Sequence, residues 1–349
     1  MRVLYIYAGE RRNKFKGEIC VDYADTQFYG LNHLKKFGID AEYKEWGDFW
    51  LGRTLNFLSF NIKHALMFFA TRGYDVVFGS SVLNMMIFKK IFGSRTSKFI
   101  LLNISLKRLW QGNQDKPIKK FVINWLLKDL DGVVCLSSEQ EDFCKINFPY
   151  LKEKFFFVPL GVDVSYNKFE RDGREDFILS AGRDNARDYK TVVEVARNLP
   201  HQKFEIVASP RNLKGINIPS NVEVNFDISP QDLGKKYRYA KALLLLTHND
   251  VYKEGADGSG QTVMLEAMAS GLPIIASRRA SLLDYVKDTE SALLVDFYDI
   301  NKAKSRVVMM GDSALREILA LNARKVVVDN FSTEMMAEKL AEIFKTIKS

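Results

Sequence analysis

The chain has 349 residues, of which 47% are hydrophobic and 27% are charged, and these values are typical of a soluble globular protein with two domains or one large domain. This composition argues against a disordered or collagen-like chain, and three cysteines are too few for a disulfide scaffold. The net charge is +8, and nearly all of the excess lies in residues 1–165, which hold 24 Lys and Arg against 17 Asp and Glu. This bias is compatible with a solvated basic face, an anionic membrane surface, an anionic substrate or nucleic acid.

The first residues resemble a buried strand and lack the cleavage pattern of a signal peptide. No apolar run reaches the ~18 residues that a transmembrane helix needs. The localisation expected from the sequence is therefore cytoplasmic, and a peripheral position on the cytoplasmic membrane face stays open as an alternative.

Short apolar runs alternate with helical patterns through the first half of the chain. Strands are expected at Val3–Ala8, Asp75–Gly79, Lys98–Asn103, Gly132–Leu136 and Lys154–Pro159. Helices are expected at Asp22–Phe37 and Pro117–Leu130. This alternation is typical of a parallel sheet that helices cover on both faces.

The pattern restarts after a polar, charged connector at Asp163–Asp176. The second set of expected strands is Phe177–Ala181, Lys203–Ala208, Val222–Phe226, Ala242–Thr247, Pro273–Ala276 and Ala292–Val295. The second set of expected helices is Tyr189–Leu199, Pro230–Tyr239, Gln261–Ser270, Ser281–Val286 and a helical tail from about Ile300.

We therefore predict an α/β protein with two doubly wound, Rossmann-like domains, residues 1–164 and 165–349, that face a central cleft. Whether the last helix packs back on the N-terminal domain stays open. Open α/β sheets bind ligands beyond the carboxyl ends of their strands. The candidate site is therefore expected on the loops that follow Ala181, Thr247 and Ala276.

A glycine-rich loop that leads into a helix is the first candidate for chemistry. It has the sequence Asp257-Gly258-Ser259-Gly260-Gln261-Thr262, and the helix also carries Glu266. Free amides at Gly260, Gln261 and Thr262, together with the helix dipole, suit a phosphate or diphosphate. A carboxylate at Glu266 suits a ribose diol, although an ordinary helix cap with a surface glutamate explains the same residues.

The second candidate follows the first strand of the second domain, where Gly182 lets the backbone turn and Arg183 and Lys190 supply cations. Arginine offers a fork of donors and lysine a point charge, and the two together suit a departing diphosphate. A charged surface turn in which Asp188 pairs with Arg187 is the alternative.

Together the two motifs resemble a known family. The residues Gly182-Arg183…Lys190 and Glu266-Ala267-Met268-Ala269-x-Gly271-x-Pro273 are similar to those of the retaining GT-B glycosyltransferases of family four, the glycosyl transferases group 1. Asp131–Ser138 and Phe157–Asp163 agree with the same family in order along the chain. The resemblance covers residues 75 to 300, and it is specific in the second domain and weak in the first.

The resemblance implies a metal-independent enzyme that moves a sugar, with retention of configuration, from a UDP- or GDP-linked donor to a glycan or lipid-linked acceptor. It needs no cofactor, since the nucleotide sugar is a substrate. Carried over by position, Arg183 and Lys190 stabilise the leaving diphosphate and Glu266 binds the ribose. The remaining donor-binding residues are Gly182, Thr247, His248, Asp257, Gly258, Ser259, Gly260, Gln261 and Thr262.

Two departures from the family pattern stand out. Gly258 occupies the position where the family usually carries a second glutamate that reaches the donor sugar. The segment Leu102–Leu106 lacks the histidine that many members carry in the first domain, so we assign no catalytic base there. The sequence leaves the donor sugar, the nucleotide, the acceptor, the linkage and the oligomeric state open.

Weaker signals suggest other partners. The pair Asp129-Leu130-Asp131 resembles a metal motif of another fold, although we expect no metal, and the basic loop Gly9–Gly17 is a candidate contact for an acceptor phosphate. The aromatic stretch Trp46–Tyr74, with nearby basic residues, is compatible with an anionic membrane surface or with an ordinary core. Rival functions are another GT-B activity, such as a sugar-nucleotide epimerase, and a basic nucleic-acid-binding protein. No nucleic-acid-binding signature accompanies the charge, so we expect no nucleic acid partner.

Overall fold

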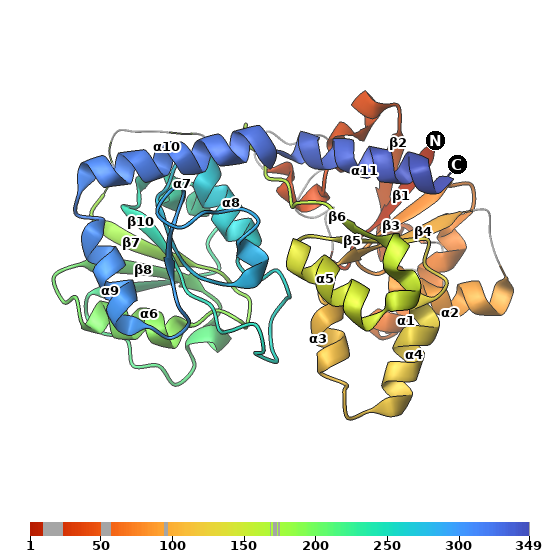
Figure 1. Cartoon of the computed structure of the whole chain (residues 1–349), viewed down its shortest axis with the longest axis horizontal. Helices are drawn as coiled ribbons and strands as arrows, with labels where there is room; N and C mark the ends of the chain where they lie inside the picture. The colour runs from red at the N-terminus through yellow and green to blue at the C-terminus, as the bar shows by residue number, and fades with distance from the viewer. Residues whose placement is uncertain are drawn as a thin grey trace. The chain divides into compact units, whose positions relative to one another are not determined.

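The computed structural model describes residues 1–9, 24–49, 57–93, 97–167, 169, 173 and 175–348, and Figure 1 follows the chain through them. The chain divides into two compact units, which we describe separately. Unit 1 contains β1, residues Gln27–Pro159 and residues Glu334–Ser349, and unit 2 contains Leu160–Thr333 together with Asp25 and Thr26. The predicted basic loop Gly9–Gly17 lies, except for Gly9, outside the described residues.

Unit 1 is built on a six-stranded parallel sheet in the order β2-β1-β3-β4-β5-β6. Its strands are β1 (Arg2–Ile6), β2 (Asp40–Lys44), β3 (Val76–Gly79), β4 (Lys98–Asn103), β5 (Gly132–Cys135) and β6 (Phe155–Phe157). Its helices are α1 (Phe60–Leu66), α2 (Val82–Phe92), α3 (Leu106–Gln111), α4 (Pro117–Leu127), α5 (Ser138–Asn147) and α11 (Thr333–Lys348). Its short 3₁₀ helices are η2 (Leu31–Phe37), η3 (Trp46–Asp48), η4 (Met67–Thr71) and η5 (Pro149–Lys154). The first two residues of η1 (Asp25–Phe28) are assigned to unit 2 and its last two to unit 1.

The last helix, α11, belongs to unit 1 although it follows the whole of unit 2 in sequence. Phe344 is fully buried, and its ring centroid lies 5.3 Å from that of Phe78 in β3. Gly30 has φ +77°, and a Cβ at this position would lie 2.9 Å from the backbone nitrogen of Ala337 in α11. A glycine is therefore needed at position 30 both for the left-handed backbone and for the close approach of the helix.

Unit 2 is built on a second six-stranded parallel sheet in the order β12-β11-β10-β7-β8-β9. Its strands are β7 (Phe177–Ala181), β8 (Lys203–Ala208), β9 (Val222–Phe226), β10 (Ala242–Leu245), β11 (Ile274–Ser277) and β12 (Leu293–Val295). Its helices are α6 (Tyr189–Arg197), α7 (Pro230–Tyr239), α8 (Gln261–Ala269), α9 (Ile300–Met309) and α10 (Ser313–Asn330), with short 3₁₀ helices η6 (Pro210–Leu213) and η7 (Ala280–Leu282). The strand order reverses between β7 and β10, and such a switch point is where open α/β sheets bind nucleotides.

The two parallel sheets confirm the predicted α/β class with two doubly wound halves. Three local predictions are wrong. The strand β2 was not predicted, because Asp40–Lys44 lies at the edge of its sheet and is largely polar. The described part of Asp22–Phe37 forms η1 and η2, which a left-handed turn at Tyr29 and Gly30 separates. Within Ser281–Val286 only the end of η7 is helical, because six residues are too few to sustain an α-helix.

None of the helices in the described part of the chain is long and apolar enough to cross a membrane.

Candidate functional site

The candidate site lies where β7 and β10 of unit 2 end. The loops that leave these two neighbouring strands are joined by backbone hydrogen bonds, from the His248 amide to the Ala186 carbonyl (2.8 Å) and from the Asp188 amide to the Leu246 carbonyl (3.0 Å). The end of β11 joins them, since the hydroxyl of its last residue, Ser277, accepts a hydrogen bond from the Thr247 amide at 3.0 Å. Three strand ends therefore hold the site at the switch point of the sheet.

Arg187 is the central cation of this site. Its side chain folds back over Gly182, where a Cβ would lie 2.3 Å from Nε of Arg187. Gly182 also has φ +144°, and its carbonyl accepts a hydrogen bond from the Tyr189 hydroxyl at 2.7 Å. The glycine predicted to turn the chain therefore also makes room for a buried guanidinium.

The Arg187 guanidinium is buried without a full set of partners. The residue is 6% exposed, and neither Nε nor Nη1 has a hydrogen-bond partner. Burial lowers the pKa of Arg187 below its usual value, because a charged group loses hydration there. A buried cation with open donors is costly unless an anion meets it, so the geometry favours an anionic ligand at this point.

The N-terminus of α8 points to the same place. Gly260 caps this helix with φ +103°, and a Cβ on Gly260 would lie 3.3 Å from Nη1 of Arg187. A helix N-terminus carries a partial positive charge and attracts anions. The predicted amide of Gln261 is already used, since it donates to the Gly258 carbonyl at 3.1 Å.

The side chain of Gln261 explains the glycine at position 258. A Cβ on Gly258 would lie 2.2 Å from Oε1 of Gln261, whose Nε2 donates to the Ser281 carbonyl at 2.9 Å. Gln261 is buried, and its carboxamide holds the loop before α8 against the loop after β11. The carboxamide therefore takes space beside the position where the family usually has a glutamate side chain.

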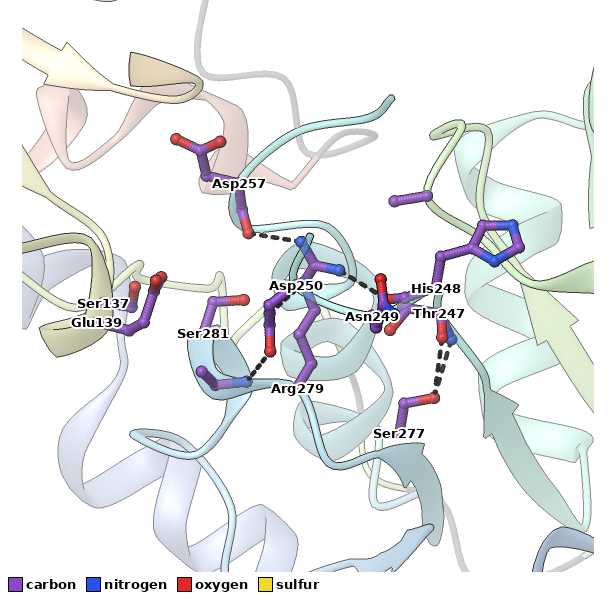
Figure 2. A network of polar contacts seen from close by, with 12 residues as sticks. Ser137, Glu139, Thr247, His248, Asn249, Asp250, Asp257, Ser277, Arg279 and Ser281 are labelled. Atoms are coloured by element: carbon purple, nitrogen blue, oxygen red, sulfur yellow. Dashed lines mark hydrogen bonds and ion pairs between the residues drawn. The ribbon is translucent and has the colours of Figure 1, made fainter. Parts of the chain in front are cut away.

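A second buried arginine ties the loops together (Figure 2). Nη1 of Arg279 donates to the His248 carbonyl at 2.9 Å, Nη2 donates to the Asp257 carbonyl at 3.3 Å, and Nε lies 3.7 Å from Oδ1 of Asp250. Oδ2 of Asp250 in turn accepts from the Ala280 amide at 3.4 Å. Figure 2 shows the carboxylate of Asp257 pointing away from Arg279, so Arg279 holds this residue by its backbone.

Three hydroxyl groups on these loops are also buried without a partner. They belong to Thr247, Ser259 and Ser281, all of which are less than 4% exposed. Figure 2 shows Thr247 and Ser281 on the two loops that Arg279 joins. Hydroxyl groups can donate and accept, so they suit both phosphate oxygens and sugar hydroxyls.

Glu266 lies one and a half turns into α8. Its Oε2 accepts a hydrogen bond from the Tyr237 hydroxyl at 3.2 Å. Burial raises the pKa of Glu266 to about 7, and the bond from Tyr237 opposes part of this rise. Near neutral pH this carboxyl is therefore poised between its two protonation states, and a ligand hydroxyl that donates to it favours the ionised form.

The other predicted residues lie at different depths. Arg183 is exposed, and its Nη2 lies 3.3 Å from Oδ1 of Asp227. Lys190 is exposed at the start of α6, which Asp188 caps by accepting from the Thr191 amide at 3.0 Å. The structure thus brings Gly182, Gly260 and the Thr247 loop together around Arg187, which the sequence analysis did not select as a site residue.

The sequence analysis did not select Arg187, because an ion pair with Asp188 on a surface turn explained it. Asp188 instead caps α6. The signal that could have identified Arg187 is its position five residues after Gly182, the glycine at which the chain turns. Arg279 and Tyr237 carried no sequence signal, since their roles depend on loops far apart in the chain. His248, also predicted, stacks on Tyr252 with ring centroids 4.1 Å apart.

The suspected metal pair Asp129 and Asp131 belongs to unit 1 and makes ion pairs there, Asp129 with Lys90 at 2.7 Å and Asp131 with Lys89 at 3.2 Å. Over the described residues, no group of three or more His, Cys, Asp or Glu side chains is arranged to hold a metal ion.

Comparison with known proteins shows what the chain is similar to. The family model described as Glycosyl transferases group 1 matches residues 164–325, which form most of unit 2. Unit 2 is thus similar to the group 1 glycosyltransferases over the matched residues. The chain is similar to an alpha-1,3/1,6-mannosyltransferase, alg-2, of Neurospora crassa (24% identity over 221 residues, 56% of this chain and 45% of the relative). It is also similar to a capsular polysaccharide biosynthesis glycosyltransferase, CapM, of Staphylococcus aureus (28% identity over 97 residues, 28% of this chain and 25% of the relative). The matches thus span less than half the length of these curated relatives.

Solved structures show the fold of the whole chain. Sucrose-phosphate synthase from Thermosynechococcus elongatus matches with a TM-score of 0.74 and 17% identity, covering 99% of this chain and 98% of that one. Anabaena Alr3699/HepE in complex with UDP-glucose matches with a TM-score of 0.70 and 11% identity, covering 99% and 100% of the two chains. The fold is therefore GT-B, as the group 1 motifs predicted.

Proposed function

We propose that this protein is a retaining glycosyltransferase that takes a sugar from a UDP- or GDP-linked donor and attaches it to a glycan or lipid-linked acceptor. The single observation that carries the proposal is the buried Arg187 guanidinium, whose Nε and Nη1 lack partners beside the N-terminus of α8. A diphosphate is the ligand that satisfies both the cation and the helix end.

In this proposal each part of the donor meets a different group. The diphosphate lies against Arg187 and the start of α8, and Arg183 supports it from the exposed edge. The ribose diol donates hydrogen bonds to Glu266, which lies one and a half turns further along the same helix. The hydroxyls of Thr247, Ser259 and Ser281 serve the phosphate oxygens and the sugar.

The chemistry follows from where negative charge grows. The bond between the anomeric carbon and the diphosphate oxygen breaks, and a bond from the acceptor hydroxyl oxygen forms on the same face of the sugar. The acceptor proton passes to the departing phosphate oxygen. Arg187 and the helix dipole stabilise the leaving diphosphate without reorganisation, which is the kind of fixed electrostatic support that accelerates such steps.

Several finer points belong to the same proposal. The relatives named mannosyltransferase and capsular polysaccharide glycosyltransferase support a glycan or lipid-linked acceptor in cell-envelope or polysaccharide synthesis. The reaction is proposed to need no metal, because Arg187 supplies positive charge at the diphosphate. The protein is proposed to work in the cytoplasm, where nucleotide sugars are at hand.

A ligand panel tests the donor assignment directly. Thermal-shift measurements with UDP, GDP and their sugar conjugates should raise the melting temperature of the full chain, since a ligand of the folded state stabilises it by mass action. The same nucleotides should have much less effect on Arg187→Met. A panel without any stabilising nucleoside diphosphate, or an equal shift in the variant, would contradict the proposed donor site.

A further inference from the structure

Helix α4 of unit 1 carries an apolar stripe on its outer side. Ile118 and Phe121 are 78% and 68% exposed, and Val122 and Trp125 are also exposed. These four residues are spaced i, i+3, i+4 and i+7, which places them on one face of the helix.

The opposite face of α4 is apolar as well. Ile123, Leu126 and Leu127 are buried in the core of unit 1. A surface helix of a globular protein normally pairs one apolar face with one polar face. The outer stripe is therefore not needed to hold α4 on the sheet, and it remains to be explained.

Helix α2, which packs against α4, extends this surface. Ile87, Ile91 and Phe92 are exposed on it, the last two by more than 60%. Lys90 connects the two helices, since its Nζ lies 4.6 Å from the ring centroid of Trp125. We call the exposed apolar side chains of α2 and α4 together the α2–α4 face.

The charge along α4 is basic, although Asp115 and Asp129 flank the helix and Asp129 pairs with Lys90 at 2.7 Å. Residues 116–128 contain four lysines and neither aspartate nor glutamate. Nζ of Lys120 lies over the Trp110 ring at 4.4 Å and Nζ of Lys128 lies 5.8 Å from the Tyr150 ring centroid, so these two ammonium groups lie against aromatic rings. Lys116 and Lys119 are exposed, and exposed lysines beside an apolar surface are suited to the boundary between lipid tails and headgroups.

We propose that the α2–α4 face docks on an anionic lipid bilayer. Exposed aliphatic and aromatic side chains would enter the acyl region, and the lysines of α4 would meet anionic headgroups. A second copy of this chain is a poorer occupant, because a symmetric contact would bring the same lysines of both copies together. Docking on a bilayer does not depend on the proposed function. Only its consequence does, namely that the enzyme would meet a lipid-linked acceptor at the membrane surface.

Co-sedimentation of the full chain with vesicles tests the apolar part of the proposal. We expect binding to phosphatidylcholine vesicles that contain phosphatidylglycerol, and little binding to phosphatidylcholine alone. The double variant Ile118→Ser/Phe121→Ser should bind at least ~10-fold more weakly, because two large apolar side chains no longer enter the bilayer. The matched control is Val308→Ser/Ile318→Ser, which removes two exposed apolar side chains from unit 2 and should bind as the wild type does.

A second pair of variants tests the charge. Lys116→Glu/Lys119→Glu should weaken binding to the anionic vesicles by ~10-fold or more, since each basic residue near such a surface contributes about 1 kcal/mol. Lys214→Glu/Lys325→Glu, with the same change of net charge on unit 2, should have a small effect. Rising salt should weaken the wild type and leave the Lys116/Lys119 variant less affected.

Trp125 provides a local readout. Vesicles should shift tryptophan emission to shorter wavelength, and Trp125→Phe should remove most of that shift while Trp46→Phe retains it. Equal vesicle binding by both double variants and their controls would overturn the proposal. So would a lipid-free dimer that Ile118→Ser/Phe121→Ser abolishes, because the face would then bind a second copy. Binding of UDP or GDP in the same variants should be unchanged, so failure here is separate from failure of the donor site.

Discussion

The two units share a parallel six-stranded sheet but differ in which polar groups they bury without partners. In unit 2 these groups include Nε and Nη1 of the Arg187 guanidinium. In the described part of unit 1 they are neutral, namely Nε1 of Trp46, Oγ of Ser81 and Nε2 of Gln140. A buried charge that lacks partners calls for a ligand of opposite charge, whereas a neutral group does not.

In the proposed function, this difference lets one architecture serve two substrates. Unit 2 has a buried cation, Arg187, at the end of the sheet where we propose that an anionic donor binds. The lysines of α4 in unit 1 lie outside, beside an exposed apolar face. Net charge alone could not distinguish these cases, because unit 2 is almost neutral overall and still contains the proposed diphosphate site. An anion site is therefore indicated by the burial of a cation and not by the number of cations in the unit.

The largest expected effect sharpens this contrast within unit 2. Arg187→Met should lower kcat/KM for sugar transfer by about 10²- to 10³-fold, because it removes the buried cation that faces the departing diphosphate. Lys190→Met removes an exposed cation from the next helix and should have a much smaller effect. Steady-state transfer rates with the donor found by thermal shift provide the measurement.

The stability of the same variant provides its control. Removing a buried charge with open donors should leave the melting temperature of the ligand-free protein unchanged or raise it. A folded Arg187→Met variant with wild-type rates would refute the assignment. If Lys190→Met lowered the transfer rate more than Arg187→Met, the role in stabilising the diphosphate would return to Lys190, as the sequence predicted.

Glu266 is expected to affect binding and stability in opposite directions. Glu266→Gln should weaken binding of the nucleoside diphosphate by ~10-fold, because a charge-assisted bond to the ribose becomes a neutral one. Since burial raises the folded-state pKa to about 7, the folded protein binds more protons than the unfolded chain between pH 4.5 and 7. The free energy of unfolding of the ligand-free wild type should therefore fall as pH rises through this window.

The neutral variant should lack that fall. At pH 8 Glu266→Gln should be more stable than the wild type by an amount on the order of 2 kcal/mol, and at pH 5 the two should be nearly equal. Glu338→Gln, at an exposed position of α11, is the matched control and should follow the wild type at both pH values. Denaturant unfolding at the two pH values measures the difference, and a variant less stable than the wild type at pH 8 would contradict the pKa argument.

A smaller effect is expected from Arg279, which holds loops and does not contact the diphosphate in this proposal. Arg279→Met should raise the KM for the donor by ~10-fold and change kcat less, because the His248 and Asp257 carbonyls lose the group that positions them. Arg278→Met is the neighbouring control, since its ion pair with Asp288 lies on a more exposed side. If kcat fell as far as kcat/KM, Arg279 would act in the transition state and the positioning role would be wrong.

The sequence predicted most of the fold because strand and helix patterns are local. The strands at Lys98–Asn103 and Phe177–Ala181 match the prediction to the residue, since each contains a short, mostly apolar run between polar segments. The break at Gly30 was missed because its cause is the close approach of Ala337, more than 300 residues away. Long-range contacts of this kind leave no periodic signal.

The candidate site was predictable as a place and not as a set of atoms. Gly182 and Gly260 could be singled out because their backbones turn beside strand and helix ends. Whether Arg187 or Lys190 is the buried cation depends on which side chain folds inward. The space over Gly182 and the role of Asp188 as a helix cap decide this. The reason for a glycine at position 258 likewise depends on where the Gln261 side chain lies.

The last prediction is an expected lack of effect. Transfer should persist at the wild-type rate in excess chelator, because Arg187, Arg183 and the α8 N-terminus supply the positive charge that a metal ion would otherwise bring to the diphosphate. The measurement is the initial rate with and without chelator, followed by addition of Mg²⁺ or Mn²⁺. A complete loss that either ion reverses would mean that the diphosphate is neutralised mainly by a metal. The buried guanidinium of unit 2 would then need another explanation, and the contrast between the two units would lose its chemical meaning.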